Sequence, residues 1–491
     1  MNNQERLLAQ VCPPGWRNPE PAPLYDLVVI GGGTAGLVCA AGAAGLGAHV
    51  AIVERDRLGG DCLNTGCVPS KALLRAARAV HDARRAAGVG IAMTPQVDFA
   101  SVMQSVRARR ADLAHNDSAQ RLSSLGAHVF LGQAMFTAPD AVAVDGRRLK
   151  FRRAVIATGG RAAVPPIDGL AATRYLTSDN IFELRDRPHS LLVIGGGAIG
   201  CELAQAFALL GTDVSIVETT PRLLPGEDPD ASEIVMRSLA ASGVRIGTGS
   251  AVRSIHVADD GQIRATVDGR EICAESVLVA VGRVPNVDGL HLESAAVVSG
   301  DRGVVVDDRL RTSNRRIFAA GDVCSRYQFT HAADAMARIV IQNSLFHGRK
   351  RVSTLIIPSA IYTFPEVAHV GPPAGHAGME NTQMVTVPLA DVDRAVIDGA
   401  TEGFLRMHHR RGRIVAATVV APNAGDLIGQ IASVMRRGGS LAEFSSDIFP
   451  YPTIAAVLRQ AGDAYRRESL TPMTRQLLER YFALGRRFSR P

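Results

Sequence analysis

The sequence predicts an α/β protein with two Rossmann-like domains, each of which contains a copy of the same strand–loop–helix–strand unit. An α+β domain follows them. A chain of 491 residues has room for about three domains of roughly 150 residues each. The segment at residues 27–54 recurs at residues 191–218 with 15 of 28 positions identical, which indicates a duplicated unit. Hydrophobic residues make up 46% of the chain and aromatic residues 5%, with 48 glycines. This composition is typical of parallel sheets whose backbone approaches a ligand closely.

Charge and cysteine content restrict the class of protein further. The net charge is +7, but residues 471–491 alone hold five arginines and one glutamate, so the remainder is nearly neutral. A nearly neutral body argues against a nucleic-acid groove. The seven cysteines are scattered, and the chain opens without a basic-then-apolar leader, which predicts a cytoplasmic protein with reduced thiols. Residues 27–53 lack charged side chains, yet their seven glycines argue against a membrane span.

Both copies of the repeat contain G-x-G-x-x-G between a hydrophobic run and a helical pattern. In a Rossmann-like unit the first glycine permits a tight turn, the second lets the backbone reach a pyrophosphate, and the third lets helix pack on strand. An acid ends the second strand of each copy, where it can accept the ribose hydroxyls. These cofactor-binding residues are Gly31, Gly33, Gly36 and Glu54 in the first copy, and Gly195, Gly197, Gly200 and Glu218 in the second.

Two dinucleotide sites in one chain imply FAD together with a nicotinamide nucleotide, and Glu218 favours NADH over NADPH because an acid disfavours a ribose phosphate. The expected order is a Pro-rich arm tied to the surface, an FAD-binding domain with helices around 71–87 and 99–124, an NAD(P)-binding domain, a return to the central domain, a dimerisation domain and a basic tail. Their boundaries are 1–24, 25–165, 166–285, 286–352, 353–470 and 471–491.

Two of these segments carry more specific expectations. Strand-like runs at 359–364, 404–407 and 414–421 open the dimerisation domain. The tail has apolar residues at roughly helical spacing among arginines. We expect a terminal helix that packs on its own protein, in preference to a helix that lies on a membrane surface.

The segment at residues 59–74 reads GGDCLNTGCVPSKALL and carries the candidate chemistry. Cys62 and Cys67 lie close together at the start of a helix, where a thiolate is favoured and a reversible disulfide can relay electrons from a flavin. Lys71 follows Cys67 by one helical turn, so its charge favours that thiolate. Because no second cysteine or histidine pair stands at ligand spacing, we expect no structural metal.

From about residue 25 to 465, these motifs resemble the pyridine nucleotide–disulfide oxidoreductase family, together with ATGG at 157–160, VGRVPN at 281–286 and FAAGDV at 318–323. The resemblance implies that Cys62 attacks the acceptor and that Cys67 faces the flavin. It also implies an ion pair of Lys71 with Glu202 beside the flavin, and Asp322 on the ribityl chain. The family motifs add Thr158, Gly159, Gly282 and Gly321 as cofactor-binding residues.

The far end of the chain departs from the disulfide-reducing members, which carry His-x-His-Pro-Thr followed by Glu. In those members the second histidine comes from the partner subunit and acts as general acid and base. Here Tyr451 replaces that histidine and Ala456 replaces the glutamate. A tyrosine at this position resembles mercuric reductase, in which tyrosines flank the metal path, and Tyr175 matches a second one. The C-terminal cysteine pair of mercuric reductase is absent.

The sequence therefore predicts a mercuric reductase-like, homodimeric flavoprotein that passes electrons from NADH through the Cys62–Cys67 pair to a soft metal ion or another electrophilic acceptor. Thiolate coordination serves metal reduction better than a base would. Two alternatives stay open. One is a reductase of a small disulfide, like dihydrolipoamide dehydrogenase or glutathione reductase. The other is a flavin redox sensor without enzymatic activity.

Overall fold

The computed structural model describes residues 1–373, 375–468 and 470–488. The chain forms two compact units. The first comprises residues 1–224 and 239–355, and the second comprises residues 225–238 with the chain from residue 356 onward. The second unit therefore includes a short segment from the middle of the chain.

The first unit is built on a sheet whose central strand, β1 (Tyr25–Ile30), is almost wholly buried. The strand β1 pairs in parallel with β2 (Val50–Glu54) and β6 (Arg147–Ile156). The strand β18 (Ile317–Ala319) pairs in parallel with β6, so the chain returns to this sheet after the second repeat. The same sheet contains β3 (Ala127–Leu131), β4 (Ala134–Ala138) and β5 (Ala141–Val144).

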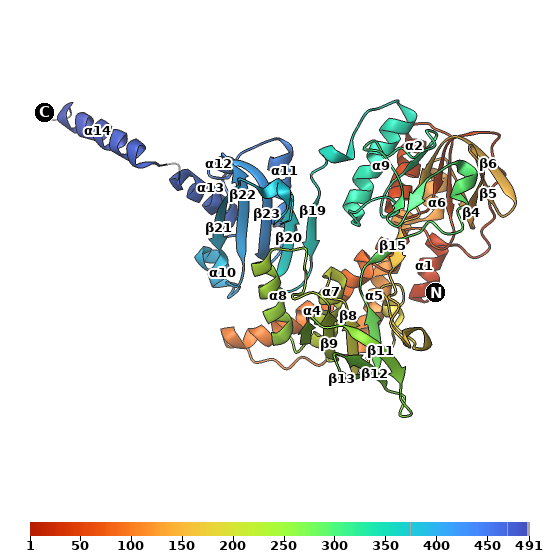
Figure 1. Ribbon diagram of the computed structural model, residues 1–491, viewed down its shortest axis with the longest axis horizontal. Helices are drawn as coiled ribbons and strands as arrows, with labels where there is room; N and C mark the ends of the chain where they lie inside the picture. The colour runs from red at the N-terminus through yellow and green to blue at the C-terminus, as the bar shows by residue number, and fades with distance from the viewer. Residues whose placement is uncertain (374, 469, 489–491) are drawn as a thin grey trace. The chain divides into compact units, whose positions relative to one another are not determined.

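The second copy of the repeat forms a smaller parallel sheet in the order β10-β9-β8-β14. Its strands are β8 (Ser190–Ile194), β9 (Asp213–Glu218), β10 (Arg245–Thr248) and β14 (Ser276–Val279). An antiparallel sheet of β11 (Val252–Val257), β12 (Ile263–Val267) and β13 (Arg270–Ala274) accompanies it. Two helices occupy equivalent places after the first strand of each copy, α2 (Thr34–Gly45) and α7 (Ala198–Leu209) (Figure 1). The α/β fold class predicted from the repeat is confirmed.

The helices after the cysteine segment differ in detail from those predicted. The helix α4 (Cys67–Arg85) begins four residues before the predicted start at 71. The region predicted as helical over 99–124 contains α5 (Phe99–Leu113), a 3-10 turn at Ala114–Asp117, and α6 (Ala119–Ser124). The break occurs because the Ser118 hydroxyl accepts the Arg121 N–H and caps a new helix.

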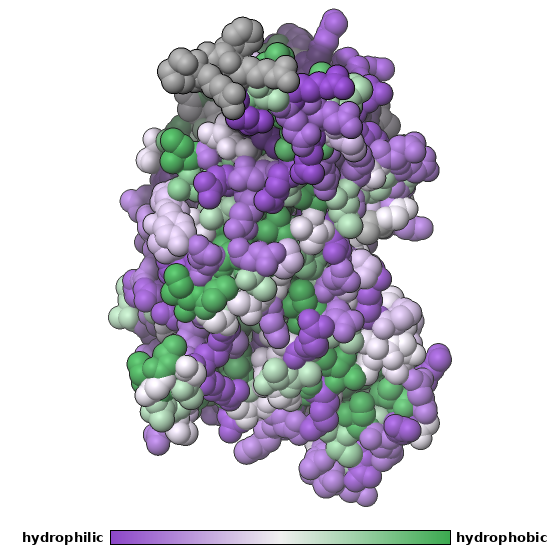
Figure 2. Space-filling model, turned by 90° about the vertical axis from the view of Figure 1, so that its left-hand side faces the viewer, coloured by the Kyte–Doolittle hydropathy of each residue, from purple (hydrophilic) through white to green (hydrophobic). Residues whose placement is uncertain are grey.

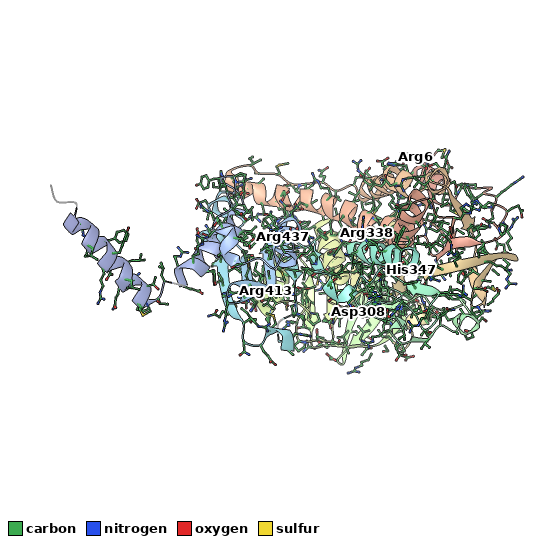
Figure 3. The ribbon with its side chains drawn as sticks, turned by 90° about the horizontal axis from the view of Figure 1, so that it is seen from above. Arg6, Asp308, Arg338, His347, Arg413 and Arg437 are labelled. Atoms are coloured by element: carbon green, nitrogen blue, oxygen red, sulfur yellow. The ribbon has the colours of Figure 1, made fainter. Side chains whose placement is uncertain are left out.

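The N-terminal arm begins with a helix, α1 (Asn3–Val11), which the Pro-rich composition of its second half did not reveal. Asn2 and Glu5 form a capping box at its start, and Leu7 and Val11 are buried. Arg6, labelled in Figure 3, pairs with Asp112 of α5 at 2.9 Å. Farther along the arm, the Trp16 indole donates to the Val129 carbonyl at 3.2 Å. The arm is thus tied to the first unit.

The second unit contains a five-stranded antiparallel sheet in the order β19-β20-β23-β22-β21, drawn in blue tones in Figure 1. Its strands are β19 (Pro358–Ile361), β20 (Glu366–Val370), β21 (Gln383–Pro388), β22 (Phe404–Arg410) and β23 (Arg413–Ala421). Three of them coincide with strand-like runs in the sequence. The helices are α10 (Asp393–Ile397), α11 (Ala424–Arg436), α12 (Leu441–Phe444) and α13 (Ala456–Glu468). Helix α11 packs on β20 and β23 over a core that includes Leu405, Val419 and Ile431.

The segment 225–238 joins this unit through an ion-pair cluster. The guanidinium of Arg406 on β22 contacts the Asp228 carboxylate at 2.7 Å and the Asp230 carboxylate at 2.6 Å. Most of α8 (Pro229–Ala241) belongs to the segment. Both Arg406 and Asp228 are largely buried, so these charge-assisted contacts hold the segment firmly.

The uncharged run at residues 27–53 lies within β1, α2 and β2 and the turns between them. Among the described residues, no helix combines the length and the apolar content that crossing a membrane requires. The face in Figure 2 is mostly hydrophilic, with separate apolar areas between polar ones.

The tail is helical, as predicted, and forms α14 (Pro472–Phe488). We expected its apolar side chains to pack on the protein, and this expectation is wrong, because the structure leaves them exposed to solvent. Leu477, Tyr481, Phe482 and Leu484 are each more than half exposed. The helical spacing was visible in the sequence, but spacing alone does not show which surface the apolar face meets.

Candidate active site

The two glycine-rich turns have the same geometry. Gly31 and Gly195 adopt φ values of 107° and 108°, a region that other residues rarely adopt. A Cβ on Gly36 would lie 1.8 Å from the Gly31 carbonyl oxygen, and a Cβ on Gly200 would lie 2.0 Å from that of Gly195. Both distances are impossible, so only glycine lets each helix approach its strand this closely. The second glycines, Gly33 and Gly197, stand at the N-termini of α2 and α7 and give no side-chain cap, which leaves backbone N–H groups available to a pyrophosphate.

The two acids at the strand ends also match. Glu54 accepts the Gly32 N–H at 2.6 Å and the Asp56 N–H at 2.8 Å. Glu218 accepts the Gly196 N–H at 2.6 Å and the Thr220 N–H at 2.8 Å. Burial raises the pKa of Glu54. Burial alone would also raise the pKa of Glu218. The hydrogen bonds from the N–H groups of Thr220 and Gly196 outweigh burial and lower this pKa, which favours the carboxylate.

A pocket opens beside Glu54, in the position where a dinucleotide's adenosine end is expected. It is lined by Ile30, Gly31, Val53, Glu54, Arg55, Gly132, Gln133, Ala134, Thr158, Asn286, Asp288 and Leu290. Together with the glycine cradle at the start of α2, these residues fit a dinucleotide such as FAD. Three predicted cofactor-binding residues, Gly31, Glu54 and Thr158, are among them.

Two short motifs pair with each other next to this pocket. The strand β7 (Gly160–Ala162), which follows Thr158 and Gly159, pairs with β15 (Arg283–Pro285), which follows Gly282. The Thr158 hydroxyl donates to the Asn286 carbonyl at 2.6 Å, and the Asn286 amide donates back to the Thr158 carbonyl at 3.0 Å. Thr158 and Asn286 are 128 residues apart in the sequence, so the two motifs are one structural feature of the first unit.

The candidate redox thiols lie on adjacent helices. Cys62 is on the short helix α3 (Gly60–Asn64), and Cys67 is the first residue of α4. A hydrogen bond from Cys62 is the main cause that lowers the pKa of Cys67 to about 6, and the Lys71 charge adds to it. The same hydrogen bond, followed by burial, raises the pKa of Cys62. At neutral pH the reduced pair thus holds a thiolate on Cys67 and a thiol on Cys62.

Lys71 and Glu202 form the predicted ion pair. The Lys71 ammonium on α4 contacts the Glu202 carboxylate on α7 at 2.8 Å. The Glu202 side chain is only 7% exposed and that of Lys71 is 37% exposed. The pair therefore holds a cation on α4 one helical turn after Cys67, and it links α4 to α7 of the second repeat.

Three residues near the thiols were not singled out from the sequence. The Thr330 hydroxyl, at the start of α9 (Thr330–Leu345), lies 3.2 Å from the Cys67 sulfur and lowers the pKa of both thiols. Arg283 binds the carboxylate of Asp61, the residue before Cys62, and also contacts Asp322 at 3.3 Å. Arg283 lies within the VGRVP motif, but no local pattern indicated its two partners.

The two candidate tyrosines lie in different units. Tyr175 is half-buried against the apolar core of the second repeat. Tyr451 is in the second unit, where it is 75% exposed and its hydroxyl donates to the Asp393 carboxylate at 2.8 Å. That hydrogen bond raises the pKa of Tyr451. Within the described part of the chain, no group of three or more His, Cys, Asp and Glu side chains is arranged to hold a metal ion.

A thiol pair beside two dinucleotide folds defines a nicotinamide-dependent flavoprotein disulfide reductase. The chain belongs to the pyridine nucleotide-disulphide oxidoreductase family, whose pattern matches residues 25–337, with the family's dimerisation domain at residues 357–461. Membership confirms the resemblance read from the sequence, and it implies a flavin and a pyridine nucleotide.

Similar proteins fall in more than one branch of this family. A mercuric reductase of Bacillus cereus is 34% identical over 89% of this chain and 71% of its own length. A dihydrolipoyl dehydrogenase of Chlamydia muridarum is 32% identical over 89% of this chain and 96% of its own. The Cu(II) complex of the HOCl-induced flavoprotein disulfide reductase RclA from Escherichia coli matches with a TM-score of 0.81 and 28% identity, over 90% of this chain and 100% of the other.

The duplicated glycine turns provide a matched pair of variants. Gly36→Ala is expected to give protein purified without flavin, because the new Cβ would collide with the Gly31 carbonyl. Gly200→Ala should retain flavin but lose nicotinamide binding, because it changes the equivalent turn of the second repeat. Flavin absorbance of the purified variants and NADH titration distinguish the two. Equal loss of flavin in both variants would contradict the assignment of one cofactor to each repeat.

Proposed function

We propose that the protein is an FAD-dependent reductase that takes electrons from NADH and delivers them through Cys62 and Cys67 to a soft metal ion such as Hg(II). The observation that carries this proposal is the identity of residue 451. A tyrosine bound to Asp393 stands where disulfide-reducing relatives have their histidine base. We further propose that the working form is a homodimer, as the dimerisation domain suggests, and that it acts in the cytoplasm.

When bound, the flavin supplies two-electron transfer between nicotinamide and sulfur. The chain's own groups would handle the sulfur chemistry. Two electrons and one proton, the equivalent of the hydride that NADH supplies, would break the Cys62–Cys67 bond. This leaves a thiolate on Cys67, where Lys71 and Thr330 stabilise it, and a thiol on Cys62. Cys62 would bind the metal as a thiolate and release its proton to water. Transfer of two electrons to Hg(II) then gives Hg(0) and reforms the disulfide.

The proton requirement favours a metal acceptor over a disulfide. Reducing a disulfide releases a thiolate that must be protonated, and this step gains from a positioned acid and base. The pKa of Tyr451 is raised by Asp393, so its hydroxyl is a poor base at neutral pH. Thiolate coordination of a soft ion needs no such group. The relatives named mercuric reductase support the same class of acceptor. The Cu(II) complex of the similar RclA adds that a protein of this fold binds a metal ion.

Reduction of a small disulfide is the second candidate, because a dihydrolipoyl dehydrogenase is also about one-third identical. The test compares acceptors with the purified holoenzyme. NADH oxidation is measured with Hg(II) in excess small thiol, with Cu(II), with lipoamide and with glutathione disulfide. Turnover that depends on Hg(II) would support metal reduction. If that turnover is unchanged in Tyr175→Phe, the Tyr175 hydroxyl is not required for it. Turnover with a disulfide alone would overturn the proposal.

We expect NADH to be preferred over NADPH, because the Glu218 carboxylate would face the extra phosphate of NADPH. Glu218→Gln removes this repulsion and should reduce the ratio of kcat/KM for NADH over NADPH by on the order of tenfold. Glu54→Gln is the matched control in the other repeat and should leave that ratio unchanged. A wild-type enzyme that prefers NADPH would contradict this assignment.

A further inference from the structure

The terminal helix α14 presents its apolar side chains to solvent along its described length. Met473 and Tyr481 are each 70% exposed, Leu477 is 58% exposed and Leu484 is 53% exposed. Every residue from 472 to 486 except Thr474 is exposed, and Thr474 is half-buried. The helix has its own start, since the Thr471 hydroxyl accepts the Thr474 N–H at 3.2 Å. It is therefore a separate helix with an uncovered apolar face.

The arrangement of side chains around α14 is amphipathic. With about 100° between successive residues, Met473, Leu477, Tyr481 and Leu484 fall within roughly one quarter of the circumference. Leu478 and Phe482 widen this apolar arc to about half the circumference. Arg480 lies at one edge of the arc, and Arg475 and Arg486 lie at the other. Glu479 is the single acid in the helix.

Arginines at both edges of an apolar arc suit a particular kind of partner. Their aliphatic stems can lie along the apolar arc, while each guanidinium forms a bidentate hydrogen bond to a phosphate. Tyr481 has an apolar ring and a polar hydroxyl, which suits the boundary between acyl chains and headgroups. Helices with this pattern lie in the plane of a lipid surface and gain both from burial and from anionic headgroups.

A second copy of the chain is a less fitting occupant. The family's dimerisation domain ends at residue 461, before α14 begins, so the shared dimer fold does not include this helix. Two such helices facing each other would also bring their arginine edges together, which like charges oppose.

We propose that α14 is a peripheral anchor that binds the surface of a bilayer containing anionic phospholipids. The arc of Met473, Leu477, Tyr481 and Leu484 enters the headgroup boundary, and Arg475, Arg480 and Arg486 contact lipid phosphates. The enzyme would thereby work at a membrane surface without crossing it. This inference does not depend on which acceptor the enzyme reduces.

The test is flotation of the full-length holoenzyme with vesicles of phosphatidylglycerol and phosphatidylcholine, compared with vesicles of phosphatidylcholine alone. We expect binding to the anionic vesicles, weakened by added salt. Reversing two charges in Arg475→Glu/Arg480→Glu should weaken the partition by on the order of tenfold or more. The apolar variant Leu477→Ser/Leu484→Ser should also release the protein, whereas NADH oxidation in solution should be unchanged in both variants.

The matched control reverses two exposed arginines outside the helix, Arg436→Glu/Arg437→Glu at the end of α11 (Arg437 is labelled in Figure 3). It changes the net charge equally and should retain vesicle binding. The absence of binding to anionic vesicles, or an equal loss in the control pair, would overturn the proposal. A change of oligomeric state in the α14 variants, measured by sedimentation without vesicles, would show instead that the helix contacts a second copy and would also overturn it.

Discussion

Replacing Cys62 by serine is expected to abolish acceptor-dependent NADH oxidation, by on the order of 10³-fold or more. A serine hydroxyl can neither form the disulfide with Cys67 nor bind a soft metal as a thiolate. Reduction of the bound flavin by NADH should persist, because the nicotinamide turn around Gly195–Gly200 is untouched. Steady-state NADH oxidation with acceptor, together with rapid-mixing measurement of flavin bleaching by NADH, separates the two half-reactions.

The matched control for this variant is Cys273→Ser. Cys273 is exposed on β13, an edge strand of the antiparallel sheet β11-β12-β13, and should be dispensable for both half-reactions. Full turnover in Cys62→Ser would move the acceptor chemistry away from the thiol pair. Loss of flavin reduction in that variant would show damage to the cofactor sites instead of loss of the thiol.

Replacing Lys71 by methionine is expected to have the second largest effect, on both stability and thiol chemistry. Glu202 is 7% exposed and would lose its ammonium partner, which should destabilise the first unit by about 2–3 kcal/mol because one partner is partly solvated. Thermal unfolding measures this loss. Lys71→Arg keeps the charge as control, and the double variant Lys71→Met/Glu202→Leu should recover part of the stability because no unpaired charge remains.

The same substitution should raise the pKa of Cys67, because the Lys71 charge helps to hold it near 6. The pH at which the reduced enzyme forms its thiolate, followed by ultraviolet absorbance, should move upward. A pKa lowered in the folded state from 9.0 stabilises the reduced protein fully above pH 9 and ceases to do so as the pH falls through about 6. In Lys71→Met this pH-dependent gain should be smaller. An unchanged titration would show that Lys71 does not act on Cys67.

Much of the site could be predicted because its motifs are local. The spacing of Gly31, Gly33 and Gly36 dictates a turn at a helix start, and the same turn recurs at Gly195. Cys67 and Lys71 share one helix face because they are four residues apart. Such features depend on short-range backbone geometry, so they are visible in the sequence without any knowledge of distant neighbours.

The helix in the N-terminal arm and the break before α6 were missed for a different reason. Asn2 with Glu5 and the Ser118 hydroxyl are capping groups, and their signals are weak beside the prolines and the helical periodicity around them. The tail was correctly predicted as a helix, but its surroundings were not, because periodicity gives the apolar face and not its partner.

By itself, the sequence determined the duplicated α/β units, the glycine turns, the thiol pair and the family. Only the tertiary structure decided which distant groups surround the thiols. Thr330 reaches Cys67 across 263 residues, and Arg283 reaches Asp61 across 222. The pair of Lys71 with Glu202, across 131 residues, was expected from the family resemblance and not from any local pattern. Contacts of this range arise from how sheets and helices pack, and packing depends on the summed burial of many side chains instead of on any local spacing.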